Sequence, residues 1–268
     1  MFKALFSDID GTILNSKHQM TPATRNILQD AQEYMHMALV SARSPSGIYP
    51  ILEKNQLSMA VISYNGAWIQ DEKRNMLYEH GMPSDQAAEI IHFLEQQIPT
   101  AAWCLYSEDT WIVKNRCDHR IQREEKIVEA VAIEGSLHTI LSFKNVHKIL
   151  CICPEHQAPV VTEKLSSRFP QLTIVPSSEI LVEIMAGGTN KANAVRFLCN
   201  HWSVPLEATV AFGDNYNDLD MLKTVGCGVL MGNAPEKLKQ QGLFVTSDYD
   251  HDGIERFLRK NMISLQFK

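Results

Sequence analysis

The sequence lacks a long apolar run and lacks any cluster of basic residues. None of its apolar stretches approaches the roughly 18 residues that a membrane-spanning helix requires, so no membrane insertion is predicted. The 25 Lys and Arg residues are scattered and the formal net charge is −6, which disfavours binding to nucleic acid or to an acidic membrane. The chain also shows no internal repeat and no low-complexity linker. With 45% hydrophobic residues it can build a sizeable core, and a small molecule is the expected partner.

The six cysteines form no regular framework of the kind that stabilises small secreted domains. Cys151 and Cys153 form a C-x-C pair in the apolar run KILCIC, and strand alternation places both on one strand face. Buried free thiols are predicted here, because Cys is among the most buried residue types, and a metal or redox role is the alternative. The chain begins with a strand-like segment instead of an export signal, so a cytoplasmic location is expected.

Strand-like and helix-like patterns alternate in the first and last parts of the chain. The runs FKALF, MALVS and MAVISYNG indicate short strands, and Thr21-Pro22 is typical of a helix start, with helical spacing that continues to Tyr34 and Met35. The same alternation returns after Gly187-Gly188, where ATVAFGD and CGVLM indicate strands between helices. Alternating strands and helices predict a parallel α/β sheet of the Rossmann-like kind.

The middle of the chain has a different pattern. The segments AWIQDEKRNMLYEHG and AAWCLYSEDTWIVKN each predict a hairpin, the second turning at Glu108-Asp109, and Ser84 is predicted to cap a helix between them. Further strands are predicted at VHKILCIC, LTIVPS and ILVEIM. We therefore predict an α/β core of residues 1–81 and 187–268, interrupted by an inserted α+β domain of residues 82–186.

Polar side chains follow the predicted core strands at the points where these strands end. In an open parallel sheet, ligands bind at the carboxyl ends of the strands, where helix N-termini point backbone N–H groups outward. The residues at these positions are Asp8 and Asp10 after the first strand, Ser41 and Arg43 after the second, Asn65 after the third, Asp214, Asn217 and Asp218 after ATVAF, and Lys191 near a helix start.

Each of these residues has a simpler interpretation when it is taken alone. Asp-Ile-Asp-Gly is typical of a turn, Asp214-Asn215 of a helix cap, and a single lysine of a solvated surface. Their joint placement favours a shared site, because independent turns and caps have no reason to follow strand ends in this order. Mg²⁺ suits such an edge, since it binds a few carboxylate oxygens and keeps water and a phosphate oxygen as further ligands. Asp8 and Asp214 are candidate ligands, and the lack of a Cys/His cluster disfavours zinc.

The motifs resemble those of a known superfamily. DIDGT, a hydroxyl residue after the second strand, a lysine that opens a late helix, and GDNYND are similar to the four motifs of the haloacid dehalogenase superfamily. The spacing and the segment SYNGA are most similar to its Cof-like phosphatases, which carry a large inserted α/β cap. The resemblance covers essentially the whole chain and implies a haloacid dehalogenase core whose cap closes over the site.

The resemblance implies a role for each motif residue and a Mg²⁺ cofactor. Asp8 would be the nucleophile and Asp10 the general acid and base, while Asp8, Asp10, Asp214 and Asp218 would hold the metal or support it. Ser41 and Lys191 would bind the phosphoryl group, and Thr12 would support the loop. Asn65 and Asn217 would lie beside the substrate or its phosphate. The implied activity is Mg²⁺-dependent hydrolysis of small phosphorylated metabolites through an aspartyl-phosphate. Sugar phosphates are the leading substrate class, followed by phosphorylated cofactors such as pyridoxal phosphate or a flavin precursor.

Two departures from the superfamily pattern leave alternatives open. Ala42 stands where relatives usually have glycine, and Ala192 follows the motif lysine where another glycine is usual. These departures leave open a non-catalytic metal- or phosphate-binding relative. Independently of them, the same aspartate pair could serve a phosphomutase or phosphotransferase. Glu183 and Met185, near the return to the core, are candidates for influencing substrate choice, with strand packing as the simpler role. We expect a monomer or weak homodimer.

Overall fold

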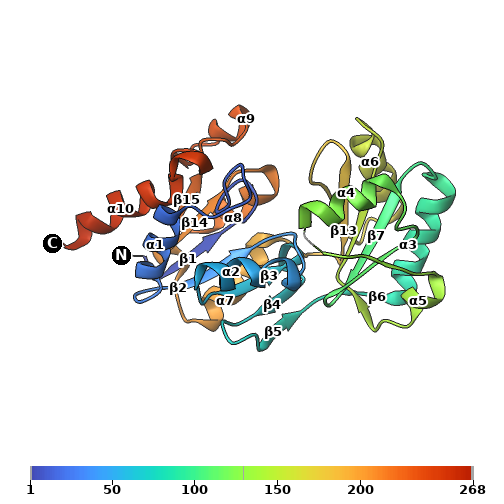
Figure 1. The fold of residues 1–268 in the computed structure, drawn as a ribbon, viewed down its shortest axis with the longest axis horizontal. Coiled ribbons are helices and arrows are strands. Elements are labelled where there is room, and N and C mark those ends of the chain that lie inside the picture. The colour runs from blue at the N-terminus through green and yellow to red at the C-terminus, as the bar shows by residue number, and fades with distance from the viewer. Residues whose placement is uncertain (1, 129, 267–268) are drawn as a thin grey trace. The chain divides into compact units, whose positions relative to one another are not determined.

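The computed structural model describes residues 2–128 and 130–266, which fold into two compact units (Figure 1). Unit 1 contains the described residues of Met1–Ala42, Ile48–Leu77 and Lys191–Lys268. Unit 2 contains those of Arg43–Gly47 and Tyr78–Asn190, so the insertion predicted at 82–186 lies within it. Among the described residues, no helix is both long enough and apolar enough to cross a membrane.

Unit 1 is built on a mainly parallel sheet. Within the described residues this sheet has eight strands in the order β16-β15-β14-β1-β2-β3-β4-β5. Neighbouring strands from β16 to β3 run parallel, and β4 is antiparallel to β3. The strands are β1 (Ala4–Ser7), β2 (His36–Val40), β3 (Ala60–Ser63), β4 (Trp68–Gln70), β5 (Met76–Glu79), β14 (Thr209–Gly213), β15 (Cys227–Leu230) and β16 (Phe244–Val245). The predicted parallel α/β fold is confirmed.

Helices cover both faces of this sheet. Leu5 and Phe212 belong to a core cluster that includes α1 and α10, whereas Phe6 belongs to a second cluster with α7 and α8. Because β1 is buried on both faces, its sequence is a continuous apolar run instead of an alternating one. The helices of unit 1 are α1 (Pro22–Ala31), α2 (Tyr49–Asn55), α7 (Lys191–His201), α8 (Leu219–Thr224), α9 (Glu236–Lys239) and α10 (Gly253–Gln266), with 3₁₀ turns η2 (Tyr64–Gly66), η3 (Leu206–Ala208), η4 (Tyr216–Asp218) and η5 (Tyr249–His251).

The topology of this sheet reverses between β1 and β14. The chain adds β2 and then β3 on one side of β1, and adds β14, β15 and β16 on the other side. At such a switch point the loops that follow the two central strands diverge and leave room for a ligand. Asp8 directly follows β1 and Asp214 directly follows β14, so both aspartates flank this point.

Unit 2 is an α+β unit with mainly antiparallel pairing. Its described residues form a six-stranded sheet in the order β12-β13-β11-β7-β8-β9 and a separate pair of β10 with β6. Ser107 pairs with Thr110 across the turn predicted at Glu108-Asp109, which confirms that hairpin. The elements are β6 (Met82–Pro83), β7 (Ala102–Ser107), β8 (Thr110–Val113), β9 (Ile133–Glu134), β10 (Asn145–Val146), β11 (Lys148–Ile152), β12 (Thr173–Pro176), β13 (Leu181–Met185), α3 (Ser84–Gln97), α4 (His119–Val128), α5 (Leu137–Leu141), α6 (Ala158–Arg168) and the 3₁₀ turn η1 (Pro45–Gly47).

Two local predictions about helix ends are wrong. The Thr21 hydroxyl caps α1 as predicted, by accepting a hydrogen bond from the Thr24 N–H. However, α1 ends at Ala31, because a turn leads directly from it into β2. Tyr34 lies in this turn and is 67% exposed. Ser84 is not an N-cap but the first residue of α3. Pairing of β6 with β10 holds the chain extended up to Pro83, which takes the cap position, so the helix begins one residue earlier than a cap at Ser84 would imply.

Several side chains singled out in unit 2 have packing roles in this structure. As predicted, Cys151 and Cys153 are buried free thiols. Their Sγ atoms lie 3.7 Å apart. A Glu183 carboxylate oxygen lies 3.6 Å from the Lys148 Nζ atom, and both side chains are buried. Met185 is also buried. An influence of Glu183 and Met185 on substrate choice stays a prediction.

The buried His147 gives unit 2 a pH-dependent stability. Its Nδ1 accepts a hydrogen bond from the Glu108 N–H at 3.0 Å, and its Nε2 lies 3.3 Å from Glu79 Oε1. Burial lowers the pKa of His147, and the Glu79 carboxylate only partly opposes this. The unfolded chain takes up the imidazole proton near pH ~6.5 and the folded chain at lower pH. The contribution to stability is therefore fully present above this value and is lost as the pH falls towards the folded pKa.

Hydrogen exchange of the Glu108 amide measures this effect directly. We expect its protection to fall as the pH is lowered through the range below about 6.5, after correction for intrinsic exchange, because a proton on Nδ1 removes the acceptor. His147→Asn keeps an acceptor oxygen without a titration in this range and is expected to abolish the extra pH dependence. Equal pH dependence in both proteins would contradict the assignment.

Candidate active site

The two central strands bring Asp8 and Asp214 to the same edge of the sheet. The Asp8 N–H donates to the Phe212 carbonyl at 3.0 Å, which extends the β1–β14 ladder to the aspartate itself. Gly11 has a φ of +82°, and a Cβ at this position would overlap the Asp214 carboxylate. Glycine in the DIDGT motif therefore permits both the turn and the close approach of the two loops.

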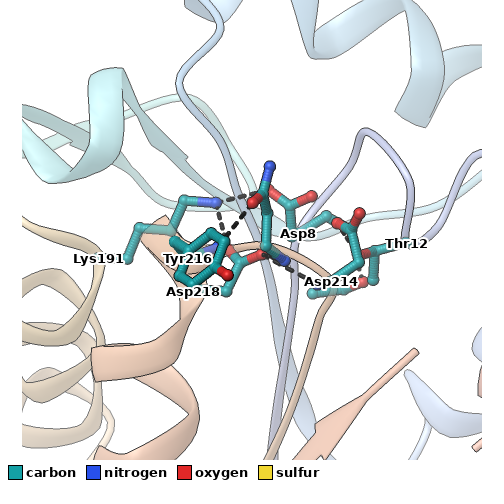
Figure 2. A network of polar contacts seen from close by, with 8 residues as sticks. Asp8, Thr12, Lys191, Asp214, Tyr216 and Asp218 are labelled. Carbon is teal, nitrogen blue, oxygen red and sulfur yellow. Dashed lines mark hydrogen bonds and ion pairs between the residues drawn. The ribbon is translucent and has the colours of Figure 1, made fainter. Parts of the chain in front are cut away.

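Three carboxylates gather at this edge (Figure 2). One oxygen from each of Asp8, Asp214 and Asp218 lies within 4.8 Å of the others, among the described residues. Asp8 is 7% exposed and Asp218 is fully buried, so water screens their charges little. The sequence-predicted carboxylates Asp8, Asp214 and Asp218 are thus brought together by the fold.

Lys191, the first residue of α7, supplies the positive charge of the cluster. Its Nζ lies 2.5 Å from Asp8 Oδ1 and 2.6 Å from Asp218 Oδ1, and the lysine side chain is buried. Burial alone disfavours the ammonium form, but the carboxylates of Asp218 and Asp8 outweigh burial and raise the pKa of Lys191. Lys191 is therefore charged and leaves the three carboxylates, if all are ionised, with an uncompensated negative charge.

The Asp218 carboxylate stabilises the loop that follows β14. Its Oδ2 accepts hydrogen bonds from the backbone N–H groups of Asp214 and Asn215, each at 3.0 Å, while its Oδ1 contacts Lys191. The Asn215 side chain in turn accepts from the Tyr216 N–H in the η4 turn. Both oxygens of Asp218 are thus engaged by the protein, which favours a supporting role over direct metal ligation.

The protein environment disfavours the ionised forms of the other two carboxylates, Asp8 and Asp214. Burial raises the pKa of Asp8 well above its ordinary range, with Lys191 opposing the rise and Asp218 and Asp214 adding to it. Burial, together with the Asp218 charge, raises the pKa of Asp214 to about 7. A divalent cation between these carboxylates would stabilise their ionised forms, and hard oxygen donors are the ligands that Mg²⁺ prefers.

Hydrogen bonds from two different loops orient the Asp214 carboxylate. Thr12 Oγ1 donates to Asp214 Oδ1 at 3.1 Å, and Asn233 Nδ2 donates to Asp214 Oδ2 at 3.2 Å. Asn233 was not among the residues predicted from the sequence. It lies three residues beyond the end of β15, so the rule that polar residues after core strands share one edge would have included it.

Of the remaining strand-end residues, Arg43 belongs to unit 2, and the others lie on neighbouring loops of unit 1. Asp10 is exposed, and its carboxylate is not among the three that lie within 4.8 Å. The loops after β2 and β3 are joined, because the Asn65 N–H donates to the Ser41 carbonyl at 2.9 Å, and both residues are buried. Asn217 is half-buried in η4. The phosphate- and substrate-binding roles of these residues stay predictions.

Comparison with known proteins decides the family. The model of the haloacid dehalogenase-like hydrolase family matches residues 5–258. The chain belongs to this family. The predicted superfamily and its fold are therefore confirmed, and the Asp8, Lys191 and Asp214 cluster lies within the matched part of this hydrolase.

Relatives match this family member over nearly its whole length. A Haemophilus influenzae protein is 31% identical over 264 residues, which cover 97% of this chain and 98% of the relative. The Bacillus subtilis 5-amino-6-(5-phospho-D-ribitylamino)uracil phosphatase YitU is 26% identical, with 94% of this chain and 95% of that protein covered. The crystal structure of a haloacid dehalogenase-like hydrolase from Bacteroides thetaiotaomicron has a TM-score of 0.87 at 25% identity, covering 97% and 99% of the two chains.

Proposed function

We propose that this protein is a Mg²⁺-dependent phosphatase that hydrolyses small phosphorylated metabolites through an aspartyl-phosphate on Asp8. The observation that carries the proposal is the group of three carboxylates at the switch point of the sheet, two of which contact one buried lysine. A cation would offset the negative charge that remains on this group. The Asp8 carboxylate, at the end of β1, would attack phosphorus. Membership in a hydrolase family supports the same conclusion.

The residues of this chain divide the reaction between them. Asp8 attacks phosphorus. Lys191, which already contacts Asp8, offsets the repulsion between the Asp8 carboxylate and the incoming phosphoryl oxygens. Asp10 donates a proton to the leaving alcohol and later takes one from the water that hydrolyses the acyl phosphate. Ser41 and Asn65, with the backbone N–H groups of their loops, bind the phosphoryl oxygens or the substrate beside them. Thr12 supports the loop, and Asn217 lies beside the substrate.

The metal is assigned to Asp8 and Asp214 instead of Asp218, whose carboxylate already accepts from two backbone N–H groups and contacts Lys191. Asp8 and Asp214 would hold Mg²⁺, with Asp10 as a further candidate and Asp218 as the supporting carboxylate. When bound, the ion supplies charge stabilisation for the phosphoryl oxygens. Spontaneous hydrolysis of phosphate monoesters is among the slowest reactions known, and enzymes accelerate it by up to ~10²¹. Electrostatic stabilisation by several groups acting together is therefore required.

The substrate class is proposed from chemistry and from the relatives. YitU acts, by its name, on a phosphorylated ribityl compound, which is a polyol phosphate. Sugar phosphates are the leading class for this chain, and phosphorylated ribityl compounds and phosphorylated cofactors are next. Unit 2 is proposed to act as the cap domain.

Removal of the metal tests the proposal. We expect phosphate release from at least one member of a metabolite panel of sugar phosphates, polyol phosphates, pyridoxal phosphate and flavin mononucleotide, measured with Mg²⁺. Release is expected to fall to the level of an Asp8→Asn blank when EDTA is in excess, and to return when Mg²⁺ is added back. Activity that survives EDTA, or that equals the blank with Mg²⁺, contradicts the proposal. Formation of a phosphate isomer without free phosphate would show phosphotransfer instead.

A further inference from the structure

Asn233 connects the Asp214 carboxylate to the loop that carries Asp8 and Asp10. Its Nδ2 donates to the Gly11 carbonyl at 2.8 Å and to Asp214 Oδ2 at 3.2 Å. Its Oδ1 accepts from the Tyr249 N–H at 3.4 Å. The amide orientation is determined by these partners, because its NH₂ group faces two acceptors and its oxygen faces a donor.

These contacts control the direction in which Asp214 presents its oxygens. Thr12 and Asn233 each donate to a different oxygen of Asp214, so two donors from separate loops hold the plane of the carboxylate. A metal ligand that is held by donors of this kind loses little freedom when it binds an ion, and hydrogen-bonded partners of ligands strongly affect metal affinity. We infer that Asn233 is a positioning residue, which orients Asp214 for a divalent cation and fixes it against the Gly11 turn; this rests on the proposed metal dependence.

The chemistry of asparagine suits this position. Two N–H donors are needed at a point where a cluster of carboxylates already concentrates negative charge. An aspartate of the same shape would remove both donors and add a like charge, and a lysine or arginine would itself compete with the cation. A neutral amide is the side chain that donates twice and adds no charge.

Cation binding in the absence of substrate separates this role from a structural one. We compare wild type, Asn233→Ala and Asn233→Leu, the last of which keeps the volume without hydrogen bonds. Thr246→Val is the matched control. It removes a hydrogen bond in the segment that leads to Tyr249, but the Thr246 hydroxyl donates to the Gly253 carbonyl and not to Asp214. Mg²⁺ affinity is measured by titration calorimetry and thermal stability by the melting temperature of each protein.

Both Asn233 variants are expected to bind Mg²⁺ about 10- to 100-fold more weakly than wild type. The Thr246→Val protein is expected to keep the wild-type Mg²⁺ affinity, even if its melting temperature falls as much as that of the Asn233 variants. Thr12→Val, which removes the other donor to Asp214, is expected to weaken binding in the same direction and serves if an Asn233 variant fails to fold.

Two results would overturn the inference in distinguishable ways. Wild-type affinity in both Asn233 variants, or an equal loss in Thr246→Val, would show that Asn233 only supports the fold while leaving the proposed phosphatase activity intact. A wild-type protein that binds no Mg²⁺ and releases no phosphate would instead remove the metal site itself, and the proposed function with it.

Discussion

Asp8→Asn is expected to lower phosphate release by at least about 1,000-fold, because removal of an enzyme's nucleophile costs orders of magnitude in kcat. The amide preserves the size of the side chain but cannot attack phosphorus. Burial raises the pKa of Asp8 although Lys191 opposes the rise, so a neutral amide avoids the cost of burying an ionised carboxylate and the repulsion from Asp218 and Asp214. The melting temperature of the variant is therefore expected to equal or exceed that of the wild type, which separates lost chemistry from lost structure. Release is measured with the best substrate at saturating Mg²⁺.

Asp220→Asn is the control for this variant. Asp220 is an exposed carboxylate in α8, two residues beyond Asp218, and it lies outside the carboxylate cluster. Its neutralisation removes the same charge from the same unit and is expected to leave the rate within about 2-fold of wild type, as for a surface substitution. A residual rate in Asp8→Asn above a tenth of wild type would rule out Asp8 as the nucleophile.

Lys191→Met is expected to destabilise the protein by about 3–5 kcal/mol and to abolish activity, because it leaves buried carboxylates without their counter-charge. The Lys191 Nζ contacts both Asp8 and Asp218, and all three side chains are nearly inaccessible to water. Methionine fills a similar volume, so the loss reports mainly on charge. Urea denaturation followed by circular dichroism measures the change in unfolding free energy.

A double variant checks that the cause is electrostatic. In Lys191→Met/Asp218→Asn one of the uncompensated carboxylates is neutral, and the amide oxygen of the new side chain can still accept from the Asp214 N–H. The double variant is therefore expected to be more stable than Lys191→Met, although both remain inactive. Equal stability of the two variants, or a Lys191→Met protein as stable as wild type, would show that the buried charges are compensated by other means.

The convergence of Asp8 and Asp214 could be predicted from the sequence, because the topology of the sheet brings these residues together. Asp8 and Asp214 follow apolar runs that pair as central parallel strands, so their convergence depends only on the strand order. Lys191 begins the helix that returns to the core, and its position at a helix start can also be read from the local sequence. The α/β fold is predictable for the same reason, and the match to the family model confirms the family.

Contacts that depend on side-chain direction were not predictable in this way. Nothing in GDNYND shows that both Asp218 oxygens are taken up by backbone amides and Lys191, or that Asp10 is exposed while Asp8 is buried. Asn233 stands two residues after the strand-like run CGVLM, so its position was predictable, but its contacts with Asp214 and Gly11 were not. The short elements α5 and β9 were also missed, since segments of this length carry too little periodicity to be recognised.

Chemical trapping of the phosphorylated residue tests the central claim most directly. Trypsin cleavage after Lys3 and Lys17 releases a peptide of residues 4–17, in which Asp8 and Asp10 are the only carboxylate side chains. Borohydride reduction of protein quenched during turnover converts an acyl phosphate to homoserine, and tandem mass spectrometry locates the conversion. The account predicts homoserine at position 8, dependent on both substrate and Mg²⁺. Conversion at position 10, or active turnover with no conversion in this peptide, would contradict it.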